Sequence, residues 1–199
     1  MVTWNVLIDE DGCFVASVDD YVDPEILENE CLETKPFQPM LKFKGIEVPQ
    51  PRLISWLADD PALTYAYSGI FLEPKPMPPA IQKLSKRLES DLSTRFPTCL
   101  LNIYRNGRDS VSWHSDNEKE LGANSTIATV SLGAIRTFEL KHRHMKPNRI
   151  VRIGLRPASL LVMIGRTQSV WLHQIPKEPA VIDQRISLTF RPHVKMGVK

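Results

Sequence analysis

The chain has 199 residues, of which 42% are hydrophobic and 24% are charged, and its formal net charge is +2. This length suits one domain with a sizeable core, while the longest apolar runs, such as residues 160–164, are too short to cross a bilayer. The acidic start of the chain lacks the basic and apolar parts of a secretory signal, and the three cysteines form no CxxC pair. We therefore expect a soluble intracellular protein, in the nucleus or the cytoplasm, with no membrane partner.

Charge is distributed unevenly along the chain. Residues 1–40 carry ten acidic side chains against one lysine, a net charge of −9, and form an acidic segment that matches no known motif. A partner surface and a lid that repels misplaced polyanions are both open interpretations of it. Residues 141–199 carry twelve basic side chains against two acidic ones, a net charge of +10. The basic half predicts binding to a polyanion, although basic side chains that merely solvate a surface are the alternative.

Two helices are predicted before the middle of the chain. Asp23 followed by Pro24 is typical of an N-cap and a first helical position. After prolines that interrupt residues 49–61, a second proline-rich stretch leads into a segment whose apolar residues fall on one helical face. These residues are Ile81, Leu84, Leu88 and Leu92.

The second half of the chain predicts strands. Six strand-like segments are separated by glycines, at residues 99–104, 126–132, 137–141, 150–155, 159–164 and 185–190. Many short strands that follow helices indicate an α+β domain whose sheets form a sandwich or barrel. A jelly roll is the leading candidate, because its open end can hold a metal ion and a small molecule.

Three polar residues form a candidate metal site. His114 and Asp116 are two apart, so on a strand edge they point the same way, and His173 would come from another strand. Two imidazoles and one carboxylate can hold one face of an Fe(II) ion and leave the other face open. Catalytic zinc is the alternative. Trp171, two residues before His173, could wall the site.

Two arginines favour an anionic ligand near that metal. Arg185 and Arg191 are six residues apart on a strand-like run and so share one face. A buried arginine needs an anionic partner, and a dicarboxylate lying along the strand would supply one at each end. A pair of structural salt bridges is the alternative, which is less attractive because few acids lie nearby in sequence.

At this point the chain resembles the AlkB family of Fe(II)- and 2-oxoglutarate-dependent dioxygenases, in its nucleic-acid-repair branch. The resemblance covers about residues 49–191. It is carried by Asn102-x-Tyr104, His114-x-Asp116, His173 and Arg185-x-Ser187-x-Thr189-Phe190-Arg191, and also by residues 65–69, 102–118 and 131–134. It implies one domain whose core, residues 99–193, is a double-stranded β-helix, or jelly roll, with N-terminal helices packed against it. Residues 41–98 would be a nucleotide-recognition region with a supporting helix, after the acidic segment 1–40.

The resemblance also implies ligand sets. His114, Asp116 and His173 would bind Fe(II) and form the catalytic centre, with 2-oxoglutarate and O2 as co-substrates. Arg185 and Tyr104 would hold the distal carboxylate of 2-oxoglutarate. The full set of implied 2-oxoglutarate contacts is Asn102, Tyr104, Arg185, Ser187, Thr189 and Arg191. The chain departs from the family at Ser187, where asparagine is usual, and at Asn117, where repair members often have aspartate.

Substrate contacts follow from the same resemblance. Glu118 matches an acid that contacts the damaged base, and Tyr67 an aromatic that stacks on the flipped base opposite the His114 ring; plain core packing is the alternative for Tyr67. The other expected substrate contacts are Tyr65, Ser68, Trp113 and Arg105. The expected contacts to the nucleic-acid backbone are Arg108, Lys141, Arg143 and Lys146. Residues 42–44 could form a wedge beside the nucleic acid, although an ordinary strand is the simpler interpretation.

The implied activity is oxidative demethylation of N-alkylated bases such as 1-methyladenine and 3-methylcytosine, in DNA, RNA or both. It would be coupled to decarboxylation of 2-oxoglutarate to succinate, with release of formaldehyde, and we expect a monomer. Two alternatives stay open. One is the same chemistry on a protein or a small molecule, and the other is a nucleic-acid-binding module without catalysis.

Overall fold

The computed structural model of the chain describes residues 3–43, 45–67, 69–145 and 147–194, and for Phe43 and Tyr67 the backbone alone. Two predicted contacts, Ser68 and Lys146, therefore lie outside the described residues, as does the side chain of Tyr67. Within these ranges, no helix is long and apolar enough to cross a membrane.

An eight-stranded sheet runs through the molecule. Its strands, in spatial order, are β1 (Asn5–Glu10), β2 (Cys13–Val18), β14 (Ser159–Gly165), β11 (Ile127–Gly133), β16 (Arg185–Arg191), β9 (Thr98–Tyr104), β5 (Leu53–Ala58) and β8 (Lys75–Pro76). Neighbours pair antiparallel except β5 and β8, which are parallel. Every residue of β9 and β16 is buried, because both faces of the sheet are covered at this point.

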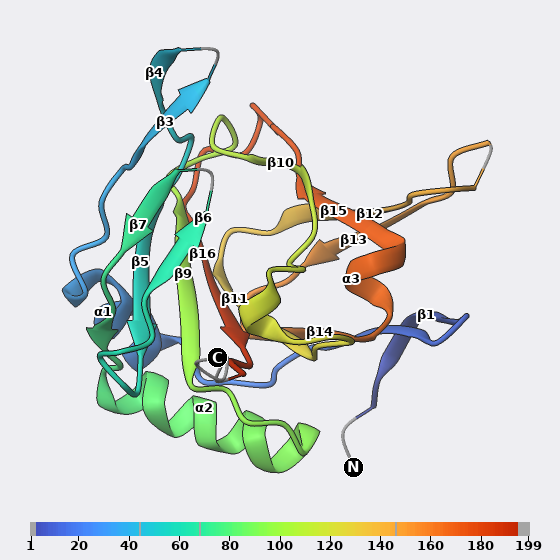
Figure 1. Cartoon of the computed structure of the whole chain (residues 1–199), viewed down its shortest axis with the longest axis horizontal. Coiled ribbons are helices and arrows are strands. Elements are labelled where there is room, and N and C mark those ends of the chain that lie inside the picture. Colours follow the sequence, from blue (N-terminus) through green and yellow to red (C-terminus); the bar gives the residue numbers. More distant parts are fainter. Residues whose placement is uncertain (1–2, 44, 68, 146, 195–199) are drawn as a thin grey trace, which may run out of the picture.

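A four-stranded sheet covers one of these faces. It has the order β10 (Val111–His114), β15 (Trp171–Ile175), β12 (Arg136–His142) and β13 (Ile150–Leu155). Burial alternates along β15, as expected for a sheet with one face inward and one toward solvent. Phe138 and Leu140 of β12 share an apolar cluster with Leu161 and Met163 of β14, which joins the two sheets. Figure 1 shows this smaller sheet opposite β11 and β16. The predicted α+β jelly roll is thereby confirmed.

Two helices cover the other face of the large sheet. They are α1 (Pro24–Glu33) and α2 (Pro79–Leu92), whose buried residues, including Leu27, Ile81 and Leu88, join one core cluster with the large sheet. Asp23 is the N-cap of α1, and its carboxylate accepts a hydrogen bond from the Glu25 amide at 3.3 Å, as the Asp-Pro pair predicts. The long helix α2 lies along the foot of the sheet in Figure 1.

Smaller elements complete the chain. They are the hairpin β3 (Met40–Phe43) and β4 (Ile46–Pro49), the hairpin β6 (Tyr65–Tyr67) and β7 (Ile70–Leu72), the turn η1 (Lys119–Leu121) and the short helix α3 (Thr167–Val170). The hairpin β3–β4 projects from one end of the molecule, at the upper left of Figure 1.

The acidic N-terminal residues partly neutralise the basic half within the molecule. Strands β1 and β2 extend the large sheet beside β14. Glu10 forms an ion pair with Arg149, and Asp19 one with Arg156 at 3.2 Å. These pairs are partly or largely exposed, so each adds little stability. Part of the negative charge of residues 1–40 is therefore paired with positive charge of residues 141–199.

Candidate active site

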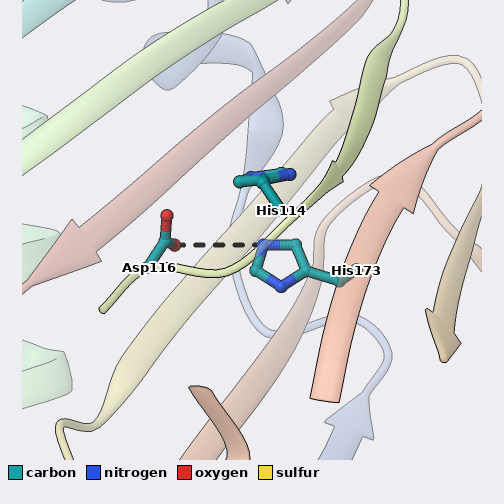
Figure 2. A group of neighbouring side chains, drawn as sticks. All are labelled: His114, Asp116 and His173. Carbon is teal, nitrogen blue, oxygen red and sulfur yellow. Dashed lines mark ion pairs between the residues drawn. The ribbon is translucent and has the colours of Figure 1, made fainter. Parts of the chain in front are cut away.

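Two neighbouring strands bring the predicted metal ligands together. His114, the last residue of β10, is the direct register partner of His173 in β15. Asp116 lies two residues beyond β10. The ligand atoms of the three side chains all lie within 4.8 Å of one another, and the two imidazole rings are 4.2 Å apart between centroids. Figure 2 shows the three side chains converging on one point.

A metal ion requires neutral imidazoles and ionised carboxylates, and the pKa shifts of His173 and Asp116 favour these forms. The Nδ1 atom of His114 is 2.8 Å from the Ser112 carbonyl, which can only accept, so Nδ1 carries the proton and Nε2 is available. Burial lowers the pKa of His173 to about 3, so this imidazole is neutral. Burial alone would raise the pKa of Asp116, but the Arg191 guanidinium beside it outweighs burial and lowers the pKa.

Asp116 is held from two sides. Its backbone amide donates to the Gln168 side chain of α3 at 2.9 Å, and Gln168 Nε2 in turn lies 3.4 Å from the sulfur of Met163. On the other side, Arg191 Nη2 donates to Asp116 Oδ1 at 2.8 Å. Sequence reasoning missed Gln168, because nothing local links it to a residue 52 positions earlier.

A cavity of about 210 Å³ lies beside these ligands, between the two sheets. Along β16, alternate residues from 185 to 191 face it, as the period of a strand requires. The predicted site residues that line it are Tyr65, Asn102, Tyr104, His114, Asp116, Glu118, His173, Arg185, Ser187, Thr189 and Arg191. A larger hollow of about 530 Å³ lies elsewhere, near Thr3 and Arg156, but none of the predicted site residues lines it, so the smaller cavity is the better candidate.

Arg185 is a buried cation, and no acidic side chain among the described residues forms an ion pair with it. Its Nη2 donates to Ser131 at 2.9 Å and, more weakly, to Ser187 at 3.5 Å. Its Nε and Nη1 atoms are buried and have no hydrogen-bond partner among the described residues. Burial lowers the pKa of this guanidinium to about 10, so it stays charged near neutral pH. Ser131 is the strand partner of Ser187. Because its hydrogen bond to Arg185 is the shorter of the two, Ser131 supports the guanidinium better than Ser187 does.

Arg191 is paired, in contrast. Besides Asp116 it contacts the Tyr65 hydroxyl, to which its Nη1 donates at 2.8 Å. Burial alone would lower the pKa of Arg191, but the adjacent Asp116 carboxylate and the other oxygens beside it raise the pKa. The alternative of a structural salt bridge therefore describes Arg191, though not Arg185. The Nε atom of Arg191 is buried without a partner among the described residues.

An acid lies beyond Arg191 in the same cavity. The Tyr65 hydroxyl donates a short hydrogen bond to Oε1 of Glu118, and Tyr65 stacks on Trp56 with ring centroids 4.6 Å apart. The other carboxylate oxygen of Glu118, Oε2, is buried and has no partner in the described part of the chain. The cavity thus offers arginine donors together with a carboxylate acceptor.

Comparison with known proteins decides the family. The sequence pattern of the 2OG-Fe(II) oxygenase superfamily matches residues 25–191. The alpha-ketoglutarate-dependent dioxygenase alkB homolog 3 of Mus musculus is 39% identical over 174 residues, and the human protein of that name 38%. The chain belongs to the AlkB family of this superfamily.

Other relatives agree. The DNA oxidative demethylase ALKBH2 of Homo sapiens is 37% identical over 138 residues, which are 66% of this chain and 53% of that protein. The alignments with the homolog 3 proteins cover 83% of this chain and 60% of theirs, so the chain spans about three fifths of their length. The solved structure of OsALKBH1 superimposes with a TM-score of 0.61 at 14% identity, over 95% of this chain and all of that one, and supports the fold alone.

The residues present fit the cofactor and co-substrate of the AlkB family. Two imidazoles and a carboxylate are a donor set suited to Fe(II) with open positions. The unpaired Nε and Nη1 atoms of Arg185 suit an anion. A zinc site would explain the three ligands, but not the buried arginine that lacks an acid.

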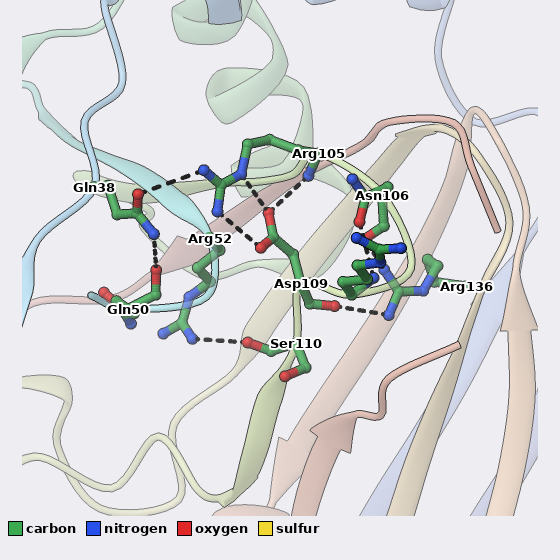
Figure 3. Close-up of polar contacts among 9 residues, drawn as sticks. Gln38, Gln50, Arg52, Arg105, Asn106, Asp109, Ser110 and Arg136 are labelled. Carbon is green, nitrogen blue, oxygen red and sulfur yellow. Dashed lines mark hydrogen bonds and ion pairs between the residues drawn. The ribbon is translucent and has the colours of Figure 1, made fainter. Parts of the chain in front are cut away.

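Two predicted substrate contacts lie elsewhere. Trp113 does not line the cavity, because neighbours along a strand project to opposite sides and its neighbour His114 points inward. Its ring lies under the Lys141 ammonium at 4.6 Å. Arg105 binds both carboxylate oxygens of Asp109, at 2.8 and 2.9 Å, and also approaches Gln38 (Figure 3). Neither residue lines the cavity, and contact of either with the substrate stays a prediction.

Three of the expected contacts to the nucleic-acid backbone lie within the described residues. Arg108 and Arg143 are exposed, and Lys141 is half-buried. Arg143 Nη2 donates to the Ser115 hydroxyl at 2.6 Å, so this arginine reaches the segment between two metal ligands. Trp171, expected to wall the site, is not among the lining residues, and Phe138 takes that place, stacked on His173 at 5.3 Å.

A third buried arginine lines the cavity without having been predicted. Arg52 Nε donates to Asn102 Oδ1 at 2.8 Å, and its Nη1 lies 3.4 Å from the Ser110 carbonyl. The contact fixes the amide orientation of Asn102. In the sequence, Arg52 is an arginine among prolines before an apolar run. This pattern is too common to identify a site.

Proposed function

We propose that this chain is an Fe(II)- and 2-oxoglutarate-dependent dioxygenase that oxidatively demethylates N-alkylated bases, such as 1-methyladenine and 3-methylcytosine, in DNA, RNA or both. One observation carries the proposal. A single cavity combines three convergent metal ligands, the unneutralised guanidinium of Arg185 and the unpartnered carboxylate oxygen of Glu118.

The metal end of the cavity supplies the oxidant. His114, Asp116 and His173 would hold Fe(II), which together with 2-oxoglutarate and O2 supplies hydroxylation of an N-methyl carbon, with succinate and carbon dioxide as co-products. The Arg185 guanidinium lies over the Tyr104 ring, 5.3 Å from its centroid. This guanidinium would hold the distal carboxylate of the co-substrate. Arg191 and Asn102 would hold the end near the metal. The hydroxylated methyl group then leaves as formaldehyde and restores the base.

The acid end of the cavity selects the base. Methylation of the Watson–Crick edge of adenine at N1, or of cytosine at N3, gives the base a positive charge. Oε2 of Glu118 is buried and without a partner in the described residues, so a cationic base would satisfy it at close range. The base must leave its stack to reach this acid, at a cost of a few kcal/mol, which a methyl group that blocks pairing reduces. Tyr67 stays proposed as the aromatic that stacks on it.

The rest of the proposal concerns partners and organisation. Lys141, Arg143 and Arg108 would contact phosphates and position the strand without reading its sequence. We propose a monomer in the nucleus or cytoplasm. The acidic segment 1–40, the nucleotide-recognition region 41–98 and the catalytic core 99–193 would act within one domain, in which the large sheet takes strands from all three.

One assay tests the activity. The chain is incubated aerobically with Fe(II), 2-oxoglutarate and matched methylated oligonucleotides, as single- and double-stranded DNA and RNA, and the products are resolved base by base. We expect unmethylated base and formaldehyde from at least one polymer. The variants His114→Ala and Asp116→Ala should lose turnover, and retained turnover in them would contradict the assignment. Release of no formaldehyde from any polymer would instead favour a protein or a small molecule as the substrate.

A further inference from the structure

Arg136 is a buried arginine that the proposed chemistry does not use. It begins β12, and no part of its side chain is exposed. Its Nη2 donates to the carbonyls of Asp109 at 2.9 Å and Pro176 at 2.6 Å, and its Nη1 to the carbonyl of Asn106 at 3.1 Å. Its Nε donates to Glu178 at 2.8 Å. Figure 3 shows the guanidinium of Arg136 against the loop that contains Asn106 and Asp109.

Two of the three carbonyls, those of Asp109 and Pro176, lie at the ends of the two strands that carry the histidines. Asp109 is two residues before β10, which ends in His114, and Pro176 directly follows β15, which contains His173. One nitrogen of Arg136 therefore joins the segment before one ligand strand to the segment after the other. Two backbone hydrogen bonds of 2.7 Å, from Gly107 to Val181 and from Glu178 to Gly107, join the same two segments farther from the strand ends.

The strand pair itself specifies this separation weakly. Only two register pairs join β10 and β15, Val111 with Ile175 and His114 with His173, and the register shifts between them. An irregular, short ladder leaves room for slippage. A rigid group outside the ladder that binds both strand ends would remove that freedom.

We infer that Arg136 is a positioning residue that sets the separation of His114 and His173 through the ends of β10 and β15. The inference rests on the proposed function, since it treats these histidines as metal ligands. Arginine suits the task because its planar fork presents several donors in fixed directions, whereas lysine has one nitrogen. Glu178, which also accepts from the Thr137 amide and hydroxyl at 3.0 and 2.7 Å, neutralises the charge.

The same guanidinium also supports the co-substrate end of the cavity. It lies 5.7 Å from the centroid of the Tyr104 ring, and the Arg185 guanidinium lies 5.3 Å from the same centroid. Tyr104 thus contacts both arginines, and loss of Arg136 would loosen it as well. A change at Arg136 should therefore weaken metal binding first and 2-oxoglutarate binding second.

The test compares Mn(II) binding by variants of similar stability. Arg136→Lys keeps the charge but loses the fork. Leu155→Ala truncates its buried strand partner and destabilises the same sheet by about 2–5 kcal/mol, from a strand that pairs with neither β10 nor β15. Mn(II) affinity is measured by calorimetry at a temperature where thermal scans show both variants folded. We expect the Kd for Mn(II) to rise about 10- to 100-fold in Arg136→Lys, and to stay within about threefold of the unmutated chain in Leu155→Ala.

Several results would overturn the inference. An unchanged Kd in Arg136→Lys would do so, and so would an equal loss in Leu155→Ala, because it would show that general stability governs metal binding. If Arg136→Lys does not fold, Glu178→Gln replaces it, with an expected loss of about tenfold, and an unchanged Kd there would overturn the inference too. Binding of Mn(II) that His114→Ala leaves intact would instead overturn the proposed metal site.

Discussion

Replacing Arg185 by methionine should stabilise the ligand-free protein while it abolishes co-substrate binding. Arg185 is 1% exposed and no acidic side chain pairs with it directly among the described residues. Its charge is therefore a cost to the folded state unless a dicarboxylate is present. Methionine keeps an unbranched chain that can fill the same space.

The magnitude follows from the pKa of Arg185. Burial lowers it from 12.5 to about 10, and at about 1.4 kcal/mol per unit this corresponds to a cost of about 3 kcal/mol. Below both values the arginine is charged in the folded and unfolded states, so the folded state bears this whole cost near neutral pH. The hydrogen bonds to Ser131 and Ser187 return about 1 kcal/mol or somewhat more. A net stabilisation of about 1–2 kcal/mol remains, which raises Tm by about 2–8 °C for a chain of this size.

The same substitution should weaken the binding of 2-oxoglutarate, although it stabilises the ligand-free protein. Removing one partner of a buried, hydrogen-bonded charge pair costs about 2–5 kcal/mol, which corresponds to at least about a 30-fold rise in the Kd for 2-oxoglutarate. Calorimetry on the anaerobic, Mn(II)-loaded protein measures this Kd, and thermal scans without 2-oxoglutarate measure Tm. The control is Arg191→Met, which leaves Asp116 buried without its arginine and should lower the free energy of unfolding by about 3 kcal/mol or more. A lower Tm in Arg185→Met together with an unchanged Kd for 2-oxoglutarate would refute the reasoning.

Three further predictions concern the substrate and the support of the co-substrate. Glu118→Gln should lower kcat/KM for cationic 1-methyladenine by about tenfold or more, roughly 1.4 kcal/mol, and should lower it much less for a neutral N-methylated base. Competition between oligonucleotides that carry the two bases measures both values of kcat/KM. Equal losses for the two bases would argue against recognition of charge. Arg143→Ala and Lys141→Ala should each reduce the slope of log affinity against log salt by about one, whereas salt-independent binding by the unmutated chain would rule out the phosphate contacts. Ser131→Ala should raise the Kd for 2-oxoglutarate by about fivefold, a loss of about 1 kcal/mol, and calorimetry that shows no change would assign the support of Arg185 to Ser187.

The strands of the core could be predicted because their signals are local. Residues 99–104 and 185–190 are apolar runs bounded by turn residues, and both became central strands buried on two faces. Strands β1 and β2 were missed, because residues 1–40 were interpreted only as an acidic segment with one helix start. Strand β5 was missed because prolines flank its six residues. These strands are specified by pairing with β14 and β9, which are distant in sequence.

The candidate site also contains residues that the sequence could predict and residues that it could not. His114 and Asp116 could be found because a strand has a period of two, and the arginines of β16 for the same reason. Gln168, Arg52 and Arg136 could not, since each acts on residues 27 to 58 positions away. Trp113 lies outside the cavity, which the inward direction of its neighbour His114 already implied. The i,i+4 spacing of Arg105 and Asp109 likewise signalled an internal ion pair.

Coupling between the two substrates tests the central claim most directly. In air, with Fe(II), succinate and formaldehyde are quantified together on a 1-methyladenine oligonucleotide and on its unmethylated twin. The proposed mechanism requires equal amounts of both products from the methylated strand, and little succinate and no formaldehyde from the twin. Succinate formation at the same rate on both strands, without formaldehyde, would contradict oxidative demethylation as the activity of this chain.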